Sequence, residues 1–168
     1  MSFWRHCHHL VWATRGREPS IQPGIEGPLR AYIVSKSAEL GVHIYAIGSC
    51  RDHIHLVAAI PPRLSVAQVV KTVKGASSHF VNHVLCPPER FAWQHGYGSM
   101  TMGATQRAAA VAYVESQKQH HAQGMANAWL ERYCERESGP PEIRQQPDEK
   151  LRIVRERVAD YDVAEVPF

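Results

Sequence analysis

Hydrophobic and polar residues alternate along the N-terminal part of the chain in patterns that predict a strand, a helix and a hairpin. Residues 3–14 are typical of a strand, and residues 24–40 carry apolar side chains at helical spacing. Residues 42–49 and 54–60 then predict two antiparallel strands joined by a tight connection. This part of the chain therefore indicates a strand, a helix and a pair of strands, in that order.

A second helix is predicted after the hairpin. Ser65 and Gln68 are spaced as in a capping box, in which each side chain satisfies a backbone amide at the helix start. Valine and phenylalanine side chains follow at helical spacing and form one apolar stripe. We expect the opposite face, with Lys71, Lys74 and Ser78, to be available to solvent or to phosphate groups.

The later part of the chain predicts one more strand and one more helix. Residues 96–102 are compatible with a fourth strand, and Thr105 opens an alanine-rich helix that continues to about His121. The order of elements indicates an α+β fold. It has an antiparallel β-sheet, helices packed on one face of the sheet, and a last helix that is free to carry a functional group.

Length and charge divide the chain into a body and a tail. With 168 residues, the chain is long enough for one globular domain, which we place at residues 1–134, followed by a charged, proline-containing extension at residues 135–168. The formal net charge is +3, but the body carries thirteen basic and seven acidic residues, whereas the extension carries six and nine. A basic body suits a polyanionic partner such as nucleic acid.

The apolar segments are too short to indicate a membrane protein. All are shorter than the roughly 18 residues that span a bilayer. The first residues alternate polar and apolar side chains, unlike a signal peptide, and the four cysteines lack a C-x-x-C pair. We therefore expect a cytoplasmic protein with reduced thiols and no membrane partner.

Two histidines lie two residues apart at the start of a predicted strand. Because side chains alternate between the faces of a strand, the imidazoles of His53 and His55 are directed to one face and Ile54 to the other. Two imidazoles on one face can bind one metal ion. With eleven histidines in the chain, the alternative is that both are half-exposed strand positions, and the same two interpretations apply to His6 and His8.

The predicted last helix carries Tyr113 and Gln117, which are neighbours on one helical face. A tyrosine can attack a phosphodiester if its phenol loses the proton and the charge of the phosphate is neutralised. A divalent cation, Mg²⁺ or Mn²⁺, held by two imidazoles and an amide oxygen would provide that neutralisation. The alternative is a tyrosine packed on the core or on the next subunit.

Five sequence blocks follow one another in a characteristic order. They are His9-Leu-Val-Trp-Ala-Thr-Arg-Gly-Arg, Asp52-His-Ile-His-Leu-Val followed by Pro61-Pro62, Lys74-Gly-Ala-Ser-Ser, Trp93-Gln-His-Gly-Tyr and Tyr113-Val-Glu-Ser-Gln. The set resembles the single-tyrosine HUH transposases of the smallest bacterial insertion sequences, over most of residues 8–122. In this resemblance the second block is similar to the HUH metal motif. The fifth is similar to the helix with the nucleophilic tyrosine and the third metal ligand.

The resemblance implies a fold, a reaction and partners. The fold would be a ferredoxin-like, RNA-recognition-like HUH nuclease fold with the catalytic tyrosine on a C-terminal helix. Tyr113 would cleave single-stranded DNA at hairpin-marked element ends, leaving a 5′-phosphotyrosine and a free 3′-OH, and a later 3′-OH would reverse the step. His53, His55 and Gln117 would hold the Mg²⁺ or Mn²⁺ ion. Relatives commonly work as homodimers that share active sites between subunits, and a bacterial transposase would be associated with the nucleoid.

Several residues are candidates for contacts with DNA. Basic side chains neutralise phosphates, and aromatic side chains stack on bases. The candidates for phosphate contacts are Arg15, Arg17, Lys71 and Lys74. Trp93 and Tyr97 are candidates for base stacking, with core packing as the alternative.

Three other functions stay open from the sequence. One is a domesticated relative that acts on repetitive extragenic palindromes, which commonly has a tail like the one beyond residue 124. Another is a non-catalytic nucleic-acid-binding module of the same fold, which predicts metal-independent binding and no covalent adduct. The third is a metal-dependent hydrolase of small substrates, which lacks the usual acidic ligands because Asp52 and Glu115 are the only carboxylates nearby in sequence.

Overall fold

The computed structural model describes residues 4 and 6–122, and the predicted extension at residues 135–168 lies outside this part of the chain. Its strands are β1 (Cys7–Ala13), β2 (His43–Ser49), β3 (His53–Ala59) and β4 (Gly98–Met102). Its α-helices are α1 (Pro23–Glu39), α2 (Val66–Phe80), α3 (Ala104–Glu115) and α4 (Gln117–Ala122). None of these helices combines the length and the apolar character needed to cross a bilayer.

The strands form one sheet in the order β2-β3-β1-β4, and each is antiparallel to its neighbours. Strand β3 therefore lies between β1 and β2, the split arrangement of a ferredoxin-like βαββαβ fold. The predicted α+β class and the hairpin of β2 and β3 are confirmed. The first strand is shorter than the predicted segment 3–14, since it begins at Cys7.

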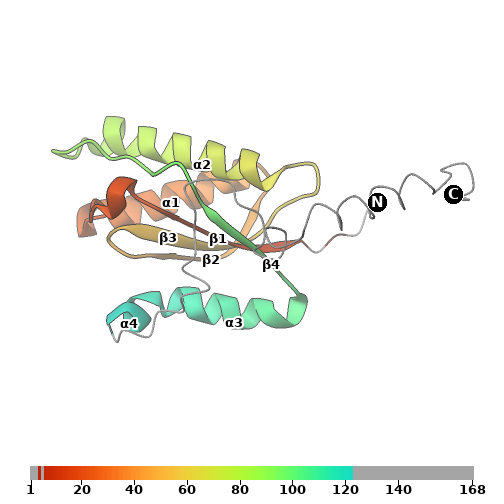
Figure 1. Cartoon of the computed structure of the whole chain (residues 1–168). Helices are drawn as coiled ribbons and strands as arrows, with labels where there is room; N and C mark the ends of the chain where they lie inside the picture. The colour runs from red at the N-terminus through yellow and green to blue at the C-terminus, as the bar shows by residue number, and fades with distance from the viewer. Residues whose placement is uncertain (1–3, 5, 123–168) are drawn as a thin grey trace, which may run out of the picture. The chain divides into compact units, whose positions relative to one another are not determined.

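Helices α1 and α2 cover one face of the sheet, as Figure 1 shows. Large side chains of β1 and β3, among them Leu10, Trp12 and Ile54, are at most 1% exposed beneath these helices. Helix α2 begins at the predicted capping box, where the Ser65 side chain accepts from the backbone amide of Gln68. This face holds the main hydrophobic core of the described residues.

Helix α3 packs on the opposite face of the sheet (Figure 1), whereas the sequence predicted helices on one face and a last helix free of the sheet. The reason is that β1 and β3 carry buried side chains on both faces. Cys7, Ala46 and Val57 are covered by Ala110 and Val114 of α3 in a second, smaller cluster. The last helix is therefore docked on the sheet and is not free of it.

The predicted helix from Thr105 to about His121 is interrupted at Ser116. Helix α3 ends at Glu115, and Ser116 has φ −94° and ψ 6°, outside the helical range. Its hydroxyl donates to the carbonyl of Ala112, four residues earlier, a contact that bends helices. Tyr113 and Gln117 consequently lie on two helices with a bend between them.

Candidate functional site

His53 and His55 lie on β3, an inner strand of the sheet, and their side chains share the face that α3 covers. Both are buried, with exposed fractions of 1% and 0%. Their ring centroids are 5.1 Å apart, and the ring planes are nearly perpendicular at 74°. The alternative that they are half-exposed strand positions is therefore wrong.

The turn before β3 fixes the orientation of His53. Its Nδ1 lies 2.6 Å from Oδ1 of Asp52, and Oδ2 of Asp52 accepts from Nη1 of Arg17 at 3.0 Å. Because a carboxylate can only accept, Nδ1 of His53 carries the proton and Nε2 keeps its lone pair. A carboxylate behind an imidazole is the arrangement found behind metal-binding histidines.

Gln117 brings an amide group to the same place from the start of α4. Its Nε2 lies 2.8 Å from Nε2 of His53, and the residue is only 1% exposed. Its Oε1 is buried without a hydrogen-bond partner among the described residues. In this orientation the amide nitrogen of Gln117 donates to Nε2 of His53 and occupies its lone pair. Because the two ends of an amide have nearly the same shape, the reversed orientation would direct Oε1 to this place, where Oε1 and Nε2 of His53 together would bind a cation.

Gly48 of β2 allows this close approach. It pairs with His55 across the hairpin, so it lies directly beneath the bend between α3 and α4. A Cβ atom at this position would collide with the backbone carbonyl of Val114 and with Oε1 of Gln117. Gln117 can therefore take this position only because residue 48 has no side chain.

Tyr113 completes the cluster from the last turn of α3. It is half-buried, and its ring centroid lies 6.2 Å from that of His55 in an edge-to-face arrangement. It also packs against the small cluster around Val57. The structure thus brings together all four residues that the sequence nominated as nucleophile and metal ligands.

The donor set fits a divalent cation. The described residues contain no group of three His, Cys, Asp or Glu side chains that could hold a metal ion, so a third ligand has to come from another residue type. The Gln117 amide oxygen is such a donor, and amide oxygens suit Mg²⁺ and Mn²⁺. Two imidazoles with one buried carbonyl oxygen are therefore the ligands that this site offers.

Sequence reasoning missed His9, whose side chain lies on the same face. Its Nε2 is 2.8 Å from Nδ1 of His55, and the two rings are stacked with centroids 4.9 Å apart. The sequence pattern instead drew attention to His6 and His8. His8 belongs to the opposite face of β1, because side chains alternate along a strand. The register between β1 and β3 is the signal that identifies His9, and it is visible only in the folded chain.

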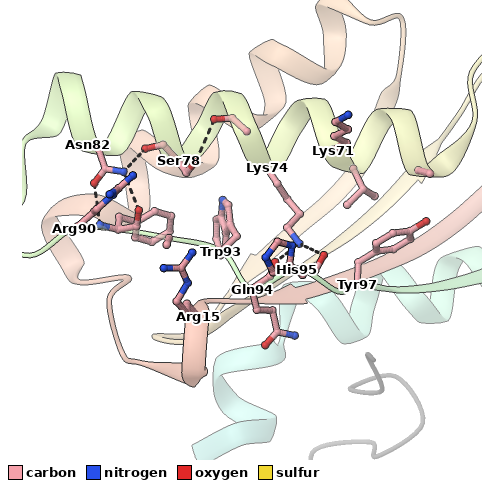
Figure 2. Close-up of a pocket in the computed structure, with 15 residues that line it drawn as sticks. Arg15, Lys71, Lys74, Ser78, Asn82, Arg90, Trp93, Gln94, His95 and Tyr97 are labelled. Carbon is pink, nitrogen blue, oxygen red and sulfur yellow. Dashed lines mark hydrogen bonds between the residues drawn. The ribbon is translucent and has the colours of Figure 1, made fainter. Parts of the chain in front are cut away.

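A second feature is a cavity of about 480 Å³ beside α2, shown in Figure 2. We call it the basic cavity, because Arg15, Lys71 and Arg90 are exposed at its lining. Among the described lining residues there is no aspartate or glutamate. Five of the six sequence-predicted DNA contacts line it, namely Arg15, Lys71, Lys74, Trp93 and Tyr97.

Lys74 departs from its expected position on a solvent-facing surface. It is 9% exposed, and its Nζ donates to the carbonyls of Gln94, His95 and Gly96 at 2.6, 3.1 and 2.9 Å (Figure 2). Burial lowers the pKa of Lys74 to about 8. The expectation of solvent exposure is wrong because the 94–96 segment folds over the helix and takes all three donors of the ammonium group.

The two aromatic candidates behave differently. Trp93 is 7% exposed, donates from Nε1 to the Ser77 hydroxyl at 2.9 Å, and packs edge-on against Trp12 and Phe91. The core interpretation of Trp93 therefore holds in this structure. Tyr97 is half-buried, and it both lines the basic cavity and packs against the main core.

The turn Arg15–Arg17 connects the two features. Arg15 lines the basic cavity, whereas Arg17 contacts Asp52 behind His53. Gly16 has φ 64° in this turn, a conformation that favours glycine. The turn follows β1 after Thr14, so within three residues the chain both lines the basic cavity and contacts Asp52 behind His53.

Comparisons with known proteins show which family the sequence matches. The profile of the family described as "Transposase IS200 like" matches residues 2–117. The chain is 25% identical to the ISDra2 transposase TnpA of Deinococcus radiodurans over 115 residues, which cover 66% of this chain and 82% of that protein. It is 33% identical to the IS200 transposase of Salmonella typhimurium over 76 residues, which cover 45% of this chain and 49% of that protein.

Two solved structures share the fold. One is a Deinococcus radiodurans R1 protein described as a transposase, with a TM-score of 0.55, 21% identity, and coverage of 76% of this chain and 97% of that chain. The other is a REP-associated tyrosine transposase bound to a REP hairpin, with a TM-score of 0.55, 16% identity, and coverage of 75% and 76%. The four-stranded antiparallel sheet with its helices is thus the fold of known transposases.

Proposed function

Because the chain belongs to the IS200-like transposase family, we propose that it cleaves and rejoins single-stranded DNA at hairpin-marked ends through a 5′-phosphotyrosine on Tyr113. The observation that carries this proposal is the convergence of four side chains in one buried place. Tyr113, His53, His55 and Gln117 come from β3, α3 and the start of α4.

His53, His55 and the Oε1 atom of Gln117 would hold the Mg²⁺ or Mn²⁺ ion of this site. The ion would neutralise the charge of the scissile phosphate and orient it. Asp52 keeps Nδ1 of His53 protonated, and Arg17 balances the charge of Asp52. These contacts pre-organise the imidazole before DNA binds.

The chain's own contribution to the reaction is the position of Tyr113. Its Oη atom forms a bond with phosphorus, and the bond from phosphorus to the 3′ oxygen breaks. The tyrosine proton leaves, and the departing 3′ oxygen takes up a proton, so the products are a 5′-phosphotyrosine and a 3′-OH. The 3′-OH of another strand reverses these bonds, which conserves the energy of the phosphodiester.

The basic cavity and the turn Arg15–Arg17 are our candidates for the DNA interface. Three exposed cations at the lining of one cavity suit a phosphate backbone, because each contact releases condensed counterions. The REP-associated transposase of similar fold is bound to a DNA hairpin, which supports a hairpin as the class of ligand. In this proposal the hairpin contacts Arg15, Lys71 and Arg90, and the single strand continues past Arg17 to Tyr113.

The test of the reaction is a covalent-adduct assay. End-labelled single-stranded DNA from the flanks of the gene is incubated with the protein and Mn²⁺, and a denaturant-resistant band is measured. We expect a metal-dependent band that Tyr113→Phe abolishes and that Tyr32→Phe keeps, because Tyr32 stacks on Phe80 in the core layer. A band that survives in Tyr113→Phe contradicts the proposal. DNA binding without any adduct in the wild-type protein favours the non-catalytic module instead.

The same assay separates a mobile element from a domesticated relative. Flanking palindromes at both element ends are the expected substrate of the transposase. Adduct formation only on dispersed palindromic repeats of the host identifies the domesticated activity. Both outcomes keep Tyr113 as the nucleophile.

We also propose that the protein works as a homodimer in which active sites are shared between subunits. Helix α3 is attached to the sheet by a small cluster, and it follows Gly103, so a second copy can supply the same contacts. The test mixes Tyr113→Phe protein with protein that carries both His53→Ala and His55→Ala. Each is inactive alone, and shared sites predict that the mixture regains adduct formation. A mixture that stays inactive indicates that each site uses the tyrosine of its own chain.

A further inference from the structure

The site contains a third buried histidine to which the proposed reaction gives no role. His9 is 0% exposed and lies on β1, two residues before Val11, which pairs with His55. Its Nε2 and Nδ1 of His55 are 2.8 Å apart, which is hydrogen-bond distance. Since His55 is also 0% exposed, water cannot replace this contact.

The contact contains one proton, and its position decides what His55 can do. If Nδ1 of His55 donates to His9, the neutral His55 ring keeps a lone pair on Nε2 and can bind a cation there. If His9 donates to His55, the neutral His55 ring carries its proton on Nε2 and cannot bind a cation with that nitrogen. The acceptor behind a histidine thus sets the tautomer of the metal ligand.

His53 shows how the same requirement is met at the neighbouring position. Its Nδ1 lies 2.6 Å from the carboxylate of Asp52, which has no proton to give. The partner of Nδ1 in His55 is the imidazole of His9, whereas the partner of Nδ1 in His53 is a carboxylate. The ring stacking, with an interplanar angle of 23°, adds a fixed orientation to the hydrogen bond.

We propose that His9 is a positioning residue whose Nε2 accepts the Nδ1 proton of His55 and so holds His55 in the tautomer that binds the divalent cation. This inference rests on the proposed role of His55 as a metal ligand. It predicts that any residue 9 with a suitably placed acceptor maintains the site. It also predicts that an apolar residue 9 of similar size loses metal affinity while the fold persists.

The first test reads the tautomer directly in the metal-free full-length protein. Long-range ¹H–¹⁵N correlation spectra of ¹⁵N-histidine-labelled protein distinguish protonated from unprotonated ring nitrogens. The His55 signals are those missing from the His55→Gln spectrum. We expect the proton on Nδ1 of His55 in the wild type. A proton on Nε2 overturns the proposal, and this result requires neither metal binding nor activity.

The second test measures Mn²⁺ affinity from the electron paramagnetic resonance signal of free Mn²⁺. His9→Leu is expected to weaken binding by about 10- to 100-fold, the range typical for loss of the partner of a metal-bound histidine. His9→Gln places a carbonyl acceptor near the position of Nε2, and its affinity is expected to stay close to wild type. The matched control is His8→Leu, which changes a half-buried histidine on the other face of the same strand.

The outcomes separate this inference from the proposed function. Wild-type affinity in His9→Leu, or equal losses in His9→Leu and His9→Gln, overturns the role of His9 and leaves the reaction intact. A wild-type protein that binds no Mn²⁺ and forms no adduct contradicts the proposed function, and the tautomer of His55 still decides the role of His9. If His9→Leu does not fold, the proposal is decided by the tautomer of His55 in the wild-type spectrum and by the Mn²⁺ affinity of His9→Gln.

Discussion

The two faces of the sheet differ in what they bury and in how firmly they are covered. Under α1 and α2, the strands bury aromatic and branched aliphatic side chains in one large cluster. Under α3, the same strands bury histidines, and the apolar cluster there is small and built from Cys7, Ala46, Val57, Ala110 and Val114. The comparison teaches that one face supplies most of the apolar burial, whereas the other gathers imidazole and amide groups.

This division has a physical reason. Burying apolar surface stabilises by roughly 25 cal/mol per Å², whereas burying imidazole and amide groups costs free energy unless each finds a partner. The α3 face meets this cost with specific contacts, such as those of His53 to Asp52 and of His55 to His9. Stability and chemistry therefore use different residues of the same two strands.

The largest expected effect comes from removing a large side chain on the α1 and α2 face. Trp12 is 0% exposed, so Trp12→Ala leaves a cavity and is expected to lower the free energy of unfolding by about 3–5 kcal/mol. Val114→Ala on the other face is the comparison and should cost roughly 1–2 kcal/mol. Urea denaturation followed by circular dichroism measures both. Equal losses would contradict the proposed difference between the faces.

Lys74 gives the next largest effect. Lys74→Met removes the donor from three carbonyls, and at pH 7 it should lower the free energy of unfolding by about 1–3 kcal/mol. The measurement is urea denaturation of both proteins, with Lys71→Met as a control for loss of an exposed charge on the same helix.

The pH dependence of this difference follows from the pKa of Lys74. Burial lowers its pKa to about 8 in the folded protein, below the ordinary value of 10.5, so the unfolded chain binds more protons between these values. The contribution of Lys74 to stability should therefore rise as the pH increases from 8 to about 10. Wild type should gain stability relative to Lys74→Met over this range. A constant or shrinking difference would show that the three carbonyls keep the ammonium charged.

A smaller effect on stability and a selective effect on the site are expected from Gly48→Ala. The added Cβ would collide with the Val114 carbonyl and the Gln117 side chain, so the bend between α3 and α4 must move away from β2. We expect the free energy of unfolding to fall by about 1–2 kcal/mol, because the backbone carbonyl of Val114 must move while the main core is untouched. Adduct formation should fall by 10-fold or more, since displacement of about 1 Å can cost 10²-fold in rate. Hydrogen exchange of α3 amides measures the displacement, and unchanged exchange with unchanged activity would contradict the role of Gly48.

The smallest effect is expected at the rim of the α3 face. Lys118 is exposed, and its Nζ lies 2.7 Å from a carboxylate oxygen of Glu26 on α1. Such exposed ion pairs contribute about 0–1 kcal/mol to stability. The loss in free energy of unfolding caused by Lys118→Ala should therefore be close to the smallest difference that urea denaturation detects. A loss above this range, or one unaffected by 0.5 M salt, would show that the pair anchors α4 more strongly than its exposure indicates.

The sequence predicted the individual elements better than it predicted how they meet in three dimensions. The periodicity of α2 and its capping box at Ser65 are local signals, and both are confirmed. The burial of Lys74 depends on a segment twenty residues away that folds over the helix. The helical spacing alone placed Lys74 on the solvent-facing side, because it contains no information about that segment. His9 was missed for the same reason, because its meeting with His55 depends on strand register. The roles of Tyr113, His53, His55 and Gln117 stay predictions that the adduct assay tests.

The way Lys74 holds the 94–96 segment has a consequence for engineering. Its ammonium contacts only backbone carbonyls, which every amino acid provides. The exposed side chain of His95 can therefore be exchanged without loosening the wall of the cavity. A library randomised at this residue would keep its anchor in every member, which makes it a practical starting point for changing which ligands the cavity accepts.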